Sequence, residues 1–420
     1  MQQCIDYAIK NNIQIKQQEI SAGISKEDLI RNKAQVLPNL NGKQSNDFSY
    51  GRNFDVGSGR LTTKETFSQS FGLSANLTIF SGLQTYNNIL QSRYGYEAGK
   101  MDVDKMKNDI ALNVATAYLQ VLFNIENFEL AKVQTTITGS QVKRITAMVD
   151  AGAMAKSNLL DIAAQLASDE YTATTAKNNV DISYLTLAQF LNLDSIGGFS
   201  IVKPDLNAPG EAALLSTPTQ IYSSAASRLP EIKSAELKLR SSQKNVLVAK
   251  GAISPHVAVG ANYGSRYSEA NRDLLTGNLI PYNDQINQNT YKSLSFQVSV
   301  PLFNKLQTTV SISKAKLSME NAKYNLELTQ DQVRKTILQA HADAQAALVK
   351  YNAGTKSLEA REEFFKYAEQ KFNVGAINSY EYSDAKNKLT KAQSDVLQAK
   401  YDYIFKTKVL DFYLGKPLTF

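Results

Sequence analysis

Residues 101–153 read MDVDKMKNDIALNVATAYLQVLFNIENFELAKVQTTITGSQVKRITAMVDAGA, with no proline and almost no glycine. Since proline and glycine normally end helices, this run predicts one uninterrupted helix over 84–149. Its apolar residues step by three or four, the period of a helix face: Val103, Met106, Ile110, Val114, Ala117, Val121, Ile125 and Phe128. Such a helix would be roughly 100 Å long, so it must lie in a bundle or coiled coil.

A second helix is predicted over 157–193, after a turn at Gly152 and Ala153. Its apolar residues keep a similar phase: Leu159, Ala163, Leu166, Ala173, Val180, Tyr184, Leu187 and Leu191. The two helices should therefore pack antiparallel. A further polar helix is predicted over 2–33, and it ends before Pro38 because the residue that precedes a proline disfavours helix.

Two β-hairpins are predicted, over 39–79 and 256–302. Segment 67–79 alternates apolar and small polar residues, the period of a strand with two different faces. Its partner over 39–50 alternates less clearly, and Gly51, Gly57 and Gly59 predict the loop between them. In the second hairpin both strands alternate clearly, at Val257, Val259, Ala261, Tyr263, Leu294, Phe296, Val298, Val300 and Leu302.

The sequence repeats itself. A shift of 217 places Ala8 on Ala225 and Pro38 on Pro255, and a shift of 223 places Gly152-Ala153 on Gly375-Ala376. We therefore predict a first repeat over 1–193, a linker over 194–218 and a second repeat over 219–420. The second repeat should contain a helix, the hairpin 256–302, a long helix over 306–373 and a helix over 379–414. The prolines and glycines of 194–218 exclude long regular structure there.

Composition excludes several classes of function. The net charge of +7 comes from lysines spread along predicted helices, not gathered in an aromatic-rich patch, so no nucleic-acid partner is expected. The single cysteine, Cys4, lacks a preceding lipobox and should be a packed or half-exposed thiol in a helix. His256 and His341 have no second histidine nearby and are expected to be structural. No nucleophile-elbow, zinc or dinucleotide motif is present, so we expect no enzymatic activity, no metal site and no cofactor.

Three features of the sequence indicate whether the chain crosses a membrane, and in what form. No apolar run approaches about 18 residues, so no membrane-crossing helix is expected. The start lacks a signal-peptide pattern, which fits either a cytosolic protein or a chain whose signal has been removed. Strands with one apolar and one Ser/Asn/Gly/Gln face suit a transmembrane barrel, and about 9 to 11 residues suffice to cross. The expected lipid-facing residues are Phe71, Leu73, Leu77, Phe296 and Val298.

Four strands per chain leave two bare edges and cannot close a barrel, whereas three chains would supply twelve strands. The predicted fold class is therefore α+β. Each internally duplicated chain has long antiparallel helical hairpins that form an α-barrel, and two β-hairpins that contribute to a trimeric twelve-stranded transmembrane barrel. The alternative is a soluble coiled-coil scaffold or adhesin stalk. The apolar strand faces favour the barrel, because a scaffold has no use for them unless they pack on something apolar.

Residues 77–83, LTIFSGL, and 300–306, VPLFNKL, resemble the strand-to-helix junctions of the TolC family of outer-membrane efflux proteins. Residues 4–8, CIDYA, and 50–55, YGRNFD, resemble members from Bacteroidetes-type bacteria. The resemblance implies a homotrimer in the outer membrane that extends into the periplasm and passively conducts substrates to the exterior. It also implies a periplasmic adaptor and an inner-membrane transporter of the RND, ABC or MFS type, as in a tripartite efflux pump or type I secretion system.

The resemblance also implies that the two helical turns contact the adaptor, whereas the alternative is that their residues only shape the turns. In each turn a glycine can adopt positive φ and end one helix, while Ser157 or Ser379 can cap the next. The tip residues are Gly152, Ala153, Met154, Ser157, Gly375, Ala376, Ile377 and Ser379.

A periplasmic gate is expected at Glu381 and Asp384, which share one helix face. In the best-known TolC proteins acidic residues at these positions form rings at the pore constriction. The alternative is that the two acids only complement a helix dipole, for about 0.3 to 1 kcal/mol each. Ile377 stands where the family has an arginine, so the polar links that lock the closed tip in that relative cannot all be present.

Overall fold

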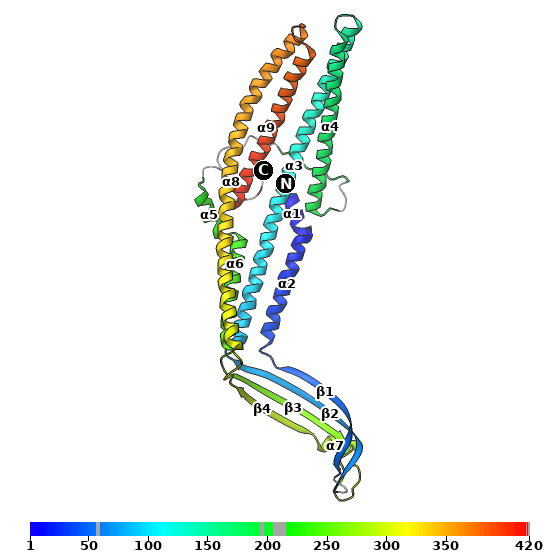
Figure 1. Ribbon diagram of the computed structural model, residues 1–420, viewed down its shortest axis with the longest axis vertical. Coiled ribbons are helices and arrows are strands. Elements are labelled where there is room, and N and C mark those ends of the chain that lie inside the picture. The colour runs from blue at the N-terminus through cyan, green and yellow to red at the C-terminus, as the bar shows by residue number, and fades with distance from the viewer. Residues whose placement is uncertain (56–58, 194–196, 205–215, 417, 419–420) are drawn as a thin grey trace. The chain divides into compact units, whose positions relative to one another are not determined.

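The computed structural model describes residues 1–55, 59–193, 197–204, 216–416 and 418. The elements in these ranges, labelled in Figure 1, are α1 (Gln2–Asn11), α2 (Ile13–Ala34), β1 (Asn39–Asp55), β2 (Arg60–Ser81), α3 (Gln84–Asp150), α4 (Lys156–Leu191), α5 (Pro218–Ala226), α6 (Pro230–Gly251), β3 (His256–Ser268), α7 (Tyr282–Gln288), β4 (Tyr291–Ser299), α8 (Gln307–Asn373) and α9 (Ser379–Leu414).

The chain divides into two compact units that do not coincide with the two sequence repeats. The first unit comprises Met1–Ala22, Gly99–Ala235 and Leu326–Phe420, and the second comprises Gly23–Ala98 and Glu236–Asn325. Each unit therefore contains part of both repeats. The boundaries fall within α2, α3, α6 and α8.

The four long helices confirm the predicted helices, and each of their ends lies within two residues of the predicted end. α3 and α4 lie within two residues of the predicted 84–149 and 157–193. The bounds of α8 and α9 are those of α3 and α4 shifted by 223, since 84 + 223 = 307 and 191 + 223 = 414. The duplication thus extends to where each helix begins and ends.

The single helix predicted over 2–33 is wrong, because the chain breaks at Asn12. Its backbone is extended, with φ −63° and ψ 129°. The Asn12 side chain accepts a hydrogen bond from the Gln14 backbone N–H at 2.9 Å and donates one to the Phe190 carbonyl at 3.0 Å. It therefore caps the start of α2 and ties it to the end of α4.

The predicted linker is too long at its C-terminal end. Pro218 opens α5, and Thr217 forms a capping box with Gln220. Of the remaining linker, 194–196 and 205–215 lie outside the described residues. Residues 197–204 are held against α3, where the Tyr118 hydroxyl donates to the Val202 carbonyl at 2.5 Å and Lys203 pairs with Glu126 at 2.9 Å.

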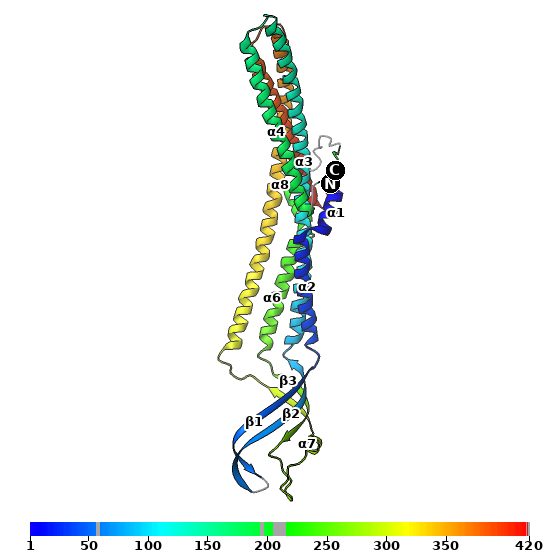
Figure 2. The same cartoon turned by 90° about the vertical axis from the view of Figure 1, so that its right-hand side faces the viewer.

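The four strands form one antiparallel sheet in chain order, β1-β2-β3-β4, as the ribbons of Figure 1 show. Figure 2 shows β1, β2 and β3 from the side. The first hairpin is longer than predicted, since its ladder runs from Asn39–Asn76 to Asp55–Arg60. Gly51, predicted in the loop, pairs with Lys64 inside the ladder. Gly59 has φ 65° and does lie at the turn, while Gly57 falls outside the described residues.

The second hairpin differs from the prediction at both ends of its last strand. β4 stops at Ser299, so Val300 and Leu302 are not strand residues, because Pro301 has no N–H to donate. Before β4 the chain forms the short helix α7, which was not predicted. The side-chain amide of Gln285, a residue that is 1% exposed, donates to the carbonyls of Ser268 and Ile280 and holds α7 against the loop.

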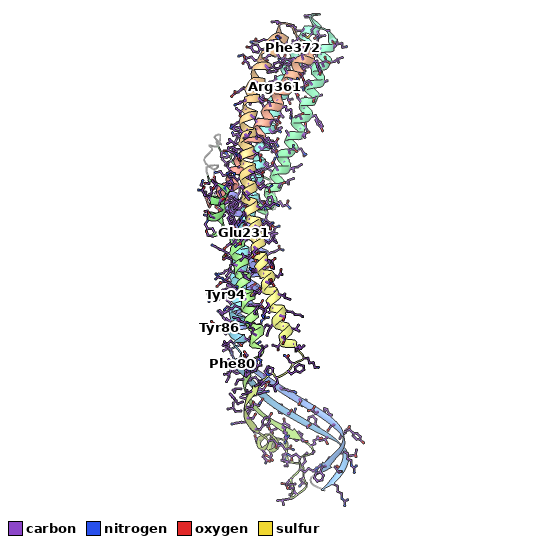
Figure 3. All side chains as sticks on the ribbon, turned by 60° about the vertical axis from the view of Figure 1, so that its left-hand side comes forward. Phe80, Tyr86, Tyr94, Glu231, Arg361 and Phe372 are labelled. Carbon is purple, nitrogen blue, oxygen red and sulfur yellow. The ribbon has the colours of Figure 1, made fainter. Side chains whose placement is uncertain are left out.

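The strand-to-helix junctions use left-handed backbone at equivalent positions. Gly82 and Leu83 have φ 61° and 62°, and Lys305 and Leu306 have φ 55° and 64°. Positive φ is strained for leucine and lysine. The first junction, just after the labelled Phe80 in Figure 3, packs backbone on backbone. A Cβ on Gly82 would lie 2.3 Å from the Gly251 carbonyl oxygen, so a side chain there is excluded.

Within the first unit, a buried polar network joins the hairpin of α3 and α4 to the hairpin of α8 and α9. The Lys386 ammonium of α9 donates to Asp169 Oδ2 of α4 at 2.7 Å, to the Gln134 carbonyl of α3 at 3.2 Å and to the Thr138 hydroxyl. The side chains of Lys386 and Asp169 are 3% and 11% exposed. All three ammonium hydrogens thus have acceptors, which offsets the desolvation of the charge.

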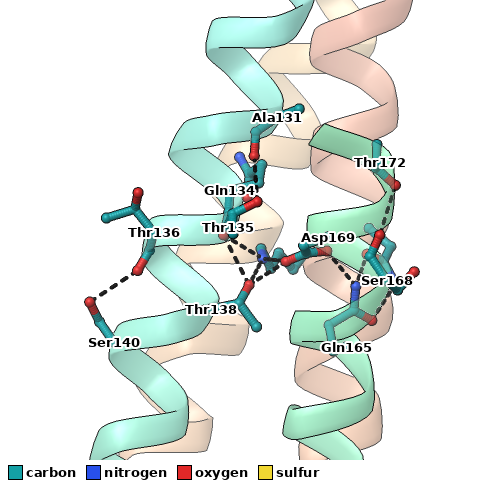
Figure 4. A network of polar contacts seen from close by, with 12 residues as sticks. Ala131, Gln134, Thr135, Thr136, Thr138, Ser140, Gln165, Ser168, Asp169 and Thr172 are labelled. Carbon is teal, nitrogen blue, oxygen red and sulfur yellow. Dashed lines mark hydrogen bonds and ion pairs between the residues drawn. The ribbon is translucent and has the colours of Figure 1, made fainter. Parts of the chain in front are cut away.

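The carboxylate is equally well held. Gln165 donates to Asp169 Oδ1 at 2.7 Å, and its amide also exchanges hydrogen bonds with Asn387 of α9 at 3.1 and 3.2 Å. Figure 4 shows the α3 and α4 side of this network, from Gln134 and Thr138 to Gln165 and Asp169. Three helices are therefore linked around one buried ion pair.

We predict that Lys386→Met lowers the free energy of unfolding by about 3 to 5 kcal/mol, because it leaves the Asp169 carboxylate buried without its counter-ion. The double variant Lys386→Met with Asp169→Leu should recover most of that loss. The control is Lys391→Met, whose ion pair with Asp395 is 77% and 57% exposed and should contribute about 1 kcal/mol or less. Urea unfolding followed by circular dichroism measures all three. Equal losses for Lys386→Met and Lys391→Met would contradict the prediction.

Candidate functional site

The register of the sheet places all five predicted lipid-facing residues on one face. Directly paired residues share a face, and Leu77 pairs with Val259, which pairs with Phe296. Residues Phe71, Leu73 and Leu77 are alternate positions of β2, and Phe296 and Val298 are alternate positions of β4. We call this side the apolar face. It also carries Leu40, Phe48, Phe67, Ala75, Val257, Ala261, Tyr263 and Leu294.

Most of the apolar face is left uncovered by the residues that the structure describes. At one end α7 lies against it, where the ring of Tyr282 is 5.0 Å from that of Tyr267 and the Tyr282 hydroxyl donates to Gln69 at 2.8 Å. Leu40, Leu294 and Phe296 are 72%, 79% and 69% exposed. An uncovered apolar surface of this extent, spread over four strands, marks a contact with lipid or with another protein.

The opposite side of the sheet, called here the polar face, carries almost only small polar residues and glycine. Its rows run across the strands, for example from Asn41 through Ser74 and Asn262 to Ser293. Such a face suits water. The sheet is therefore two-sided, as the period-two alternation predicts. The apolar side is nevertheless interrupted by Gln44, Asn46, Gln69 and Lys292.

The two helical turns have nearly identical backbones. Gly152 and Gly375 have φ 75° and 74°, which confirms the predicted left-handed ends of α3 and α8. The N–H of Ala153 reaches back to the Met148 carbonyl, and that of Ala376 to the Lys371 carbonyl, each at 2.8 Å. This is the Schellman arrangement that satisfies the last carbonyls of a helix. It leaves both glycines and both alanines exposed.

An apolar cluster supports the turns from inside. Ile145, Ile162, Phe372 and Tyr382 form it, one from each of the four long helices, and Met154 and Ile377 pack against it. The rings of Phe372, labelled near the end of α8 in Figure 3, and Tyr382 stack at 4.7 Å. Burial raises the pKa of the Tyr382 hydroxyl to about 12, and the nearby Glu369 carboxylate adds to the shift.

The predicted serine caps are wrong. α4 begins after Ala155, which makes no side-chain cap, and Ser157 is exposed on its first turn. α9 is capped by Asn378, so Ser379 lies inside the helix and is 1% exposed. Asparagine is as good a cap as serine and stands one residue earlier, which is why it takes the position.

Ser379 instead joins the two turns. Its hydroxyl contacts Asn158 Oδ1 at 2.9 Å and Asp161 Oδ2 at 3.1 Å. Asn158 and Asp161 are the first-repeat counterparts of Glu381 and Asp384, since 158 + 223 = 381 and 161 + 223 = 384. The counterparts in the first repeat thus hold the turns together within the chain.

Glu381 and Asp384 lie three residues apart near the start of α9, and each has a local partner. Glu381 completes the capping box, since the Asn378 N–H donates to its Oε2 at 3.4 Å. Asp384 forms an ion pair with Lys388 at 2.6 Å, with the two side chains 43% and 50% exposed. Lys388 was missed by sequence reasoning, although a cation four residues after an acid on one helix is a recognisable pairing signal.

The remaining expectations concern absences and isolated residues. Cys4 lies in α1, half-buried against the apolar core, and burial raises the pKa of its thiol. Within the described ranges no group of three or more His, Cys, Asp or Glu side chains could hold a metal ion. None of the helices that the structure describes combines the length and apolar character that a membrane-crossing helix needs.

The sequence matches one family model across both repeats. The model described as outer membrane efflux protein covers residues 4–193 and 221–416. The chain is 23% identical to the outer membrane efflux protein BepC of Brucella suis, over 96% of this chain and 82% of that protein. It is 22% identical to the outer membrane protein TolC of Vibrio cholerae, over 73% of this chain and 67% of that one.

Solved structures share the fold. A crystal structure of CusC superposes with a TM-score of 0.84 at 16% identity, over 99% of this chain and 92% of that one. The CmeC outer membrane channel of Campylobacter jejuni superposes with a TM-score of 0.79 at 18% identity, over 99% and 85%. The structure has the α+β fold of TolC-type channels. Because the family model spans both repeats, the chain belongs to the outer membrane efflux protein family and is an outer-membrane exit duct of the efflux type.

Proposed function

We propose that three copies of this chain close a twelve-stranded barrel through the outer membrane, with the apolar face toward lipid and the polar face toward a water-filled lumen. The observation that carries the proposal is the two-sided sheet. Its outer strands, β1 and β4, each have one side without a strand partner among the described residues. Pairing β4 of one copy with β1 of the next would satisfy these edges and leave no free one.

Phe71, Leu73, Leu77, Phe296 and Val298 are the proposed lipid contacts. The exposure of Leu73, Phe296 and Val298 supports this assignment, because lipid would remove these side chains from water without any further protein. A TolC-type assembly also accounts for the large share of the chain in long helices, which would form the periplasmic part of the duct.

Placing an arginine at Phe296 should destabilise the membrane-inserted protein by about 2 to 4 kcal/mol, since the charge would face hydrocarbon. The matched variant Gln297→Arg, one residue along β4 and therefore on the polar face, should change stability by about 1 kcal/mol or less. Urea titration of the protein in lipid vesicles measures both. A similar loss for the two variants would show that the faces are assigned wrongly.

The helical turns are the proposed docking site for a periplasmic adaptor, which connects the duct to an inner-membrane transporter of the RND, ABC or MFS type. Gly152, Ala153, Gly375 and Ala376 are exposed and lack large side chains, so a helical hairpin of the adaptor could approach the backbone closely. Ser157 is exposed beside them. Met154, Ile377 and Ser379 point inward and would keep the turns in shape.

Ala153→Arg and Ala376→Arg should abolish drug efflux in cells while leaving outer-membrane insertion unchanged. The reason is steric and electrostatic, because each arginine would occupy the space of the partner's backbone. The control is Lys156→Arg, which keeps the charge near the same turn. Minimum inhibitory concentrations, read beside the amount of protein in outer-membrane fractions, provide the test. Normal resistance in both alanine variants would remove the turns from the interface.

Glu381 and Asp384 are the proposed acidic constriction. In a trimer they would contribute six carboxylates near one level, and the Lys388 partner of Asp384 would balance part of that charge. Ile377, in place of the family's arginine, packs against the apolar cluster, which supports a closed state held by apolar contact instead of the family's polar links.

Glu381→Gln combined with Asp384→Asn should lower the cation selectivity of single channels, because neutral amides no longer attract cations at the narrowest point. Block by multivalent cations should weaken in parallel. Lys388→Gln should act in the opposite direction, since it frees the Asp384 charge. Reversal potentials in a salt gradient measure the effect, and unchanged values in both variants would place these carboxylates outside the pore.

A further inference from the structure

The polar face of the sheet carries an excess of positive charge in its middle rows. Where β1, β2 and β3 run together, from Asn39 to Asp47 of β1, its charged residues are Lys43, Asp47 and Arg266. The other positions on this face are serine, asparagine, glycine and tyrosine. Two cations thus face one acid, which stands at the far end of the stretch.

Lys43 and Arg266 lie near one another on the sheet. Lys43 pairs with Gly72, which pairs with Gly264, and Arg266 is two residues along β3 from Gly264. Two strand spacings of about 4.8 Å and a rise of about 7 Å along β3 separate their backbones by roughly 12 Å. Both side chains are exposed, and both can reach the same space above the sheet.

Gly72 and Gly264, which lie between them, leave the sheet surface without side chains of their own. A Cβ on Gly264 would lie 2.7 Å from the hydroxyl oxygen of Tyr291, so the tyrosine ring lies across β3 where a side chain would otherwise stand. The same hydroxyl lies 4.0 Å from the position of a Cβ on Gly72. The row from Lys43 to Tyr291 therefore presents an ammonium and a hydroxyl with no intervening side chain, beside the Arg266 guanidinium. Ammonium, guanidinium and phenol groups are all donors to carboxylate and phosphate oxygens.

Behind these groups the apolar face carries Phe71, Leu73 and Tyr263, together with Gln44 and Lys292. Gly72 lies between Phe71 and Leu73, which point to the apolar face. A charge on a sheet with hydrocarbon behind it is screened less than a charge in open water, and its field extends into the lumen.

We infer that Lys43 and Arg266, repeated in each copy, form a basic ring inside the membrane-crossing part of the duct that favours anionic solutes carrying carboxylate or phosphate groups. The inference rests on the proposed trimeric barrel with its polar face inward. It assigns the outer part of the duct a charge preference opposite to that of the acidic residues at the start of α9. A solute with both a positive and a negative group would then be attracted by the acidic residues of α9 through the first and by the basic ring through the second.

The test is single-channel recording of the full chain in planar lipid bilayers with a potassium chloride gradient. Lys43→Gln with Arg266→Gln should raise the ratio of cation to anion permeability by about twofold or more, because the ring no longer attracts chloride. Lys43→Glu with Arg266→Glu should raise it further. Inorganic triphosphate added to the wild-type channel should block the current, and the block should weaken in both variants.

Lys292→Gln is the matched control. Lys292 pairs with Tyr263 on the apolar face, and its ammonium lies 5.9 Å from the centre of that ring. Its removal should leave the permeability ratio and the triphosphate block unchanged. The control therefore removes the same charge from the same sheet, but from the other side.

The possible outcomes distinguish a failure of the proposed basic ring from a failure of the proposed barrel. Channels that open normally, resist triphosphate and keep their permeability ratio in the Lys43 and Arg266 variants would overturn the ring and leave the barrel intact. A shift in Lys292→Gln instead would show that the two faces are reversed. Failure of the wild-type chain to form any channel would overturn the proposed function and the ring with it. Wild-type block by triphosphate decides the matter even if the variants do not assemble, since its absence contradicts the ring.

Discussion

A backbone N–H or C=O group that faces hydrocarbon without a partner costs several kcal/mol. This constraint governs the sheet, because β1 and β4 each present an edge beside the apolar face that no described strand pairs with. The edges cannot enter lipid before they are paired, and the apolar face cannot remain in water without attracting other surfaces. Membrane insertion and the assembly of copies are therefore one coupled process in the proposed barrel.

In the helical part, the packing must fix the position of α9 along the axes of α3 and α4. Apolar stripes alone would allow α9 to slide along α3 and α4, since leucine and alanine contacts differ little from one turn to the next. The Lys386 ammonium removes this freedom, because a slip of one turn would leave it buried away from Asp169 and the Gln134 carbonyl. We interpret the buried ion pair as a device that fixes register, in the way that single buried polar residues do in coiled coils.

Sequence reasoning predicted the features that have local causes. The ends of the long helices were found within two residues because glycine at positions 152 and 375 permits a left-handed turn, and the two sheet faces followed from a period of two. The junction at 300–306 was recognised from its sequence, but the positive φ of Lys305 and Leu306 was not predicted, because strained φ in ordinary residues has no signal in composition. α7 was missed for a related reason, since the packing of Gln285 against distant carbonyls is what holds it.

The candidate site shows the same division. The turns and the acids of α9 could be located from spacing, whereas the caps could not be assigned between neighbouring polar residues such as Asn378 and Ser379. The partners of Lys386 are 217 and 252 residues away in sequence, so nothing near it predicts them. The basic ring required the register of three strands, because Lys43 and Arg266 belong to different repeats.

The close approach of Gly82 and Gly251 bears on the history of the duplication. Each repeat supplies one of the two glycines, and the positions equivalent to them, Lys305 and Ala34, carry side chains. An assembly built from copies of one repeat alone would have only one of these two glycines at each strand-to-helix junction. The halves have thus become complementary parts that no longer substitute for one another. A gene split between them would have to deliver both products in equal number to rebuild the wall.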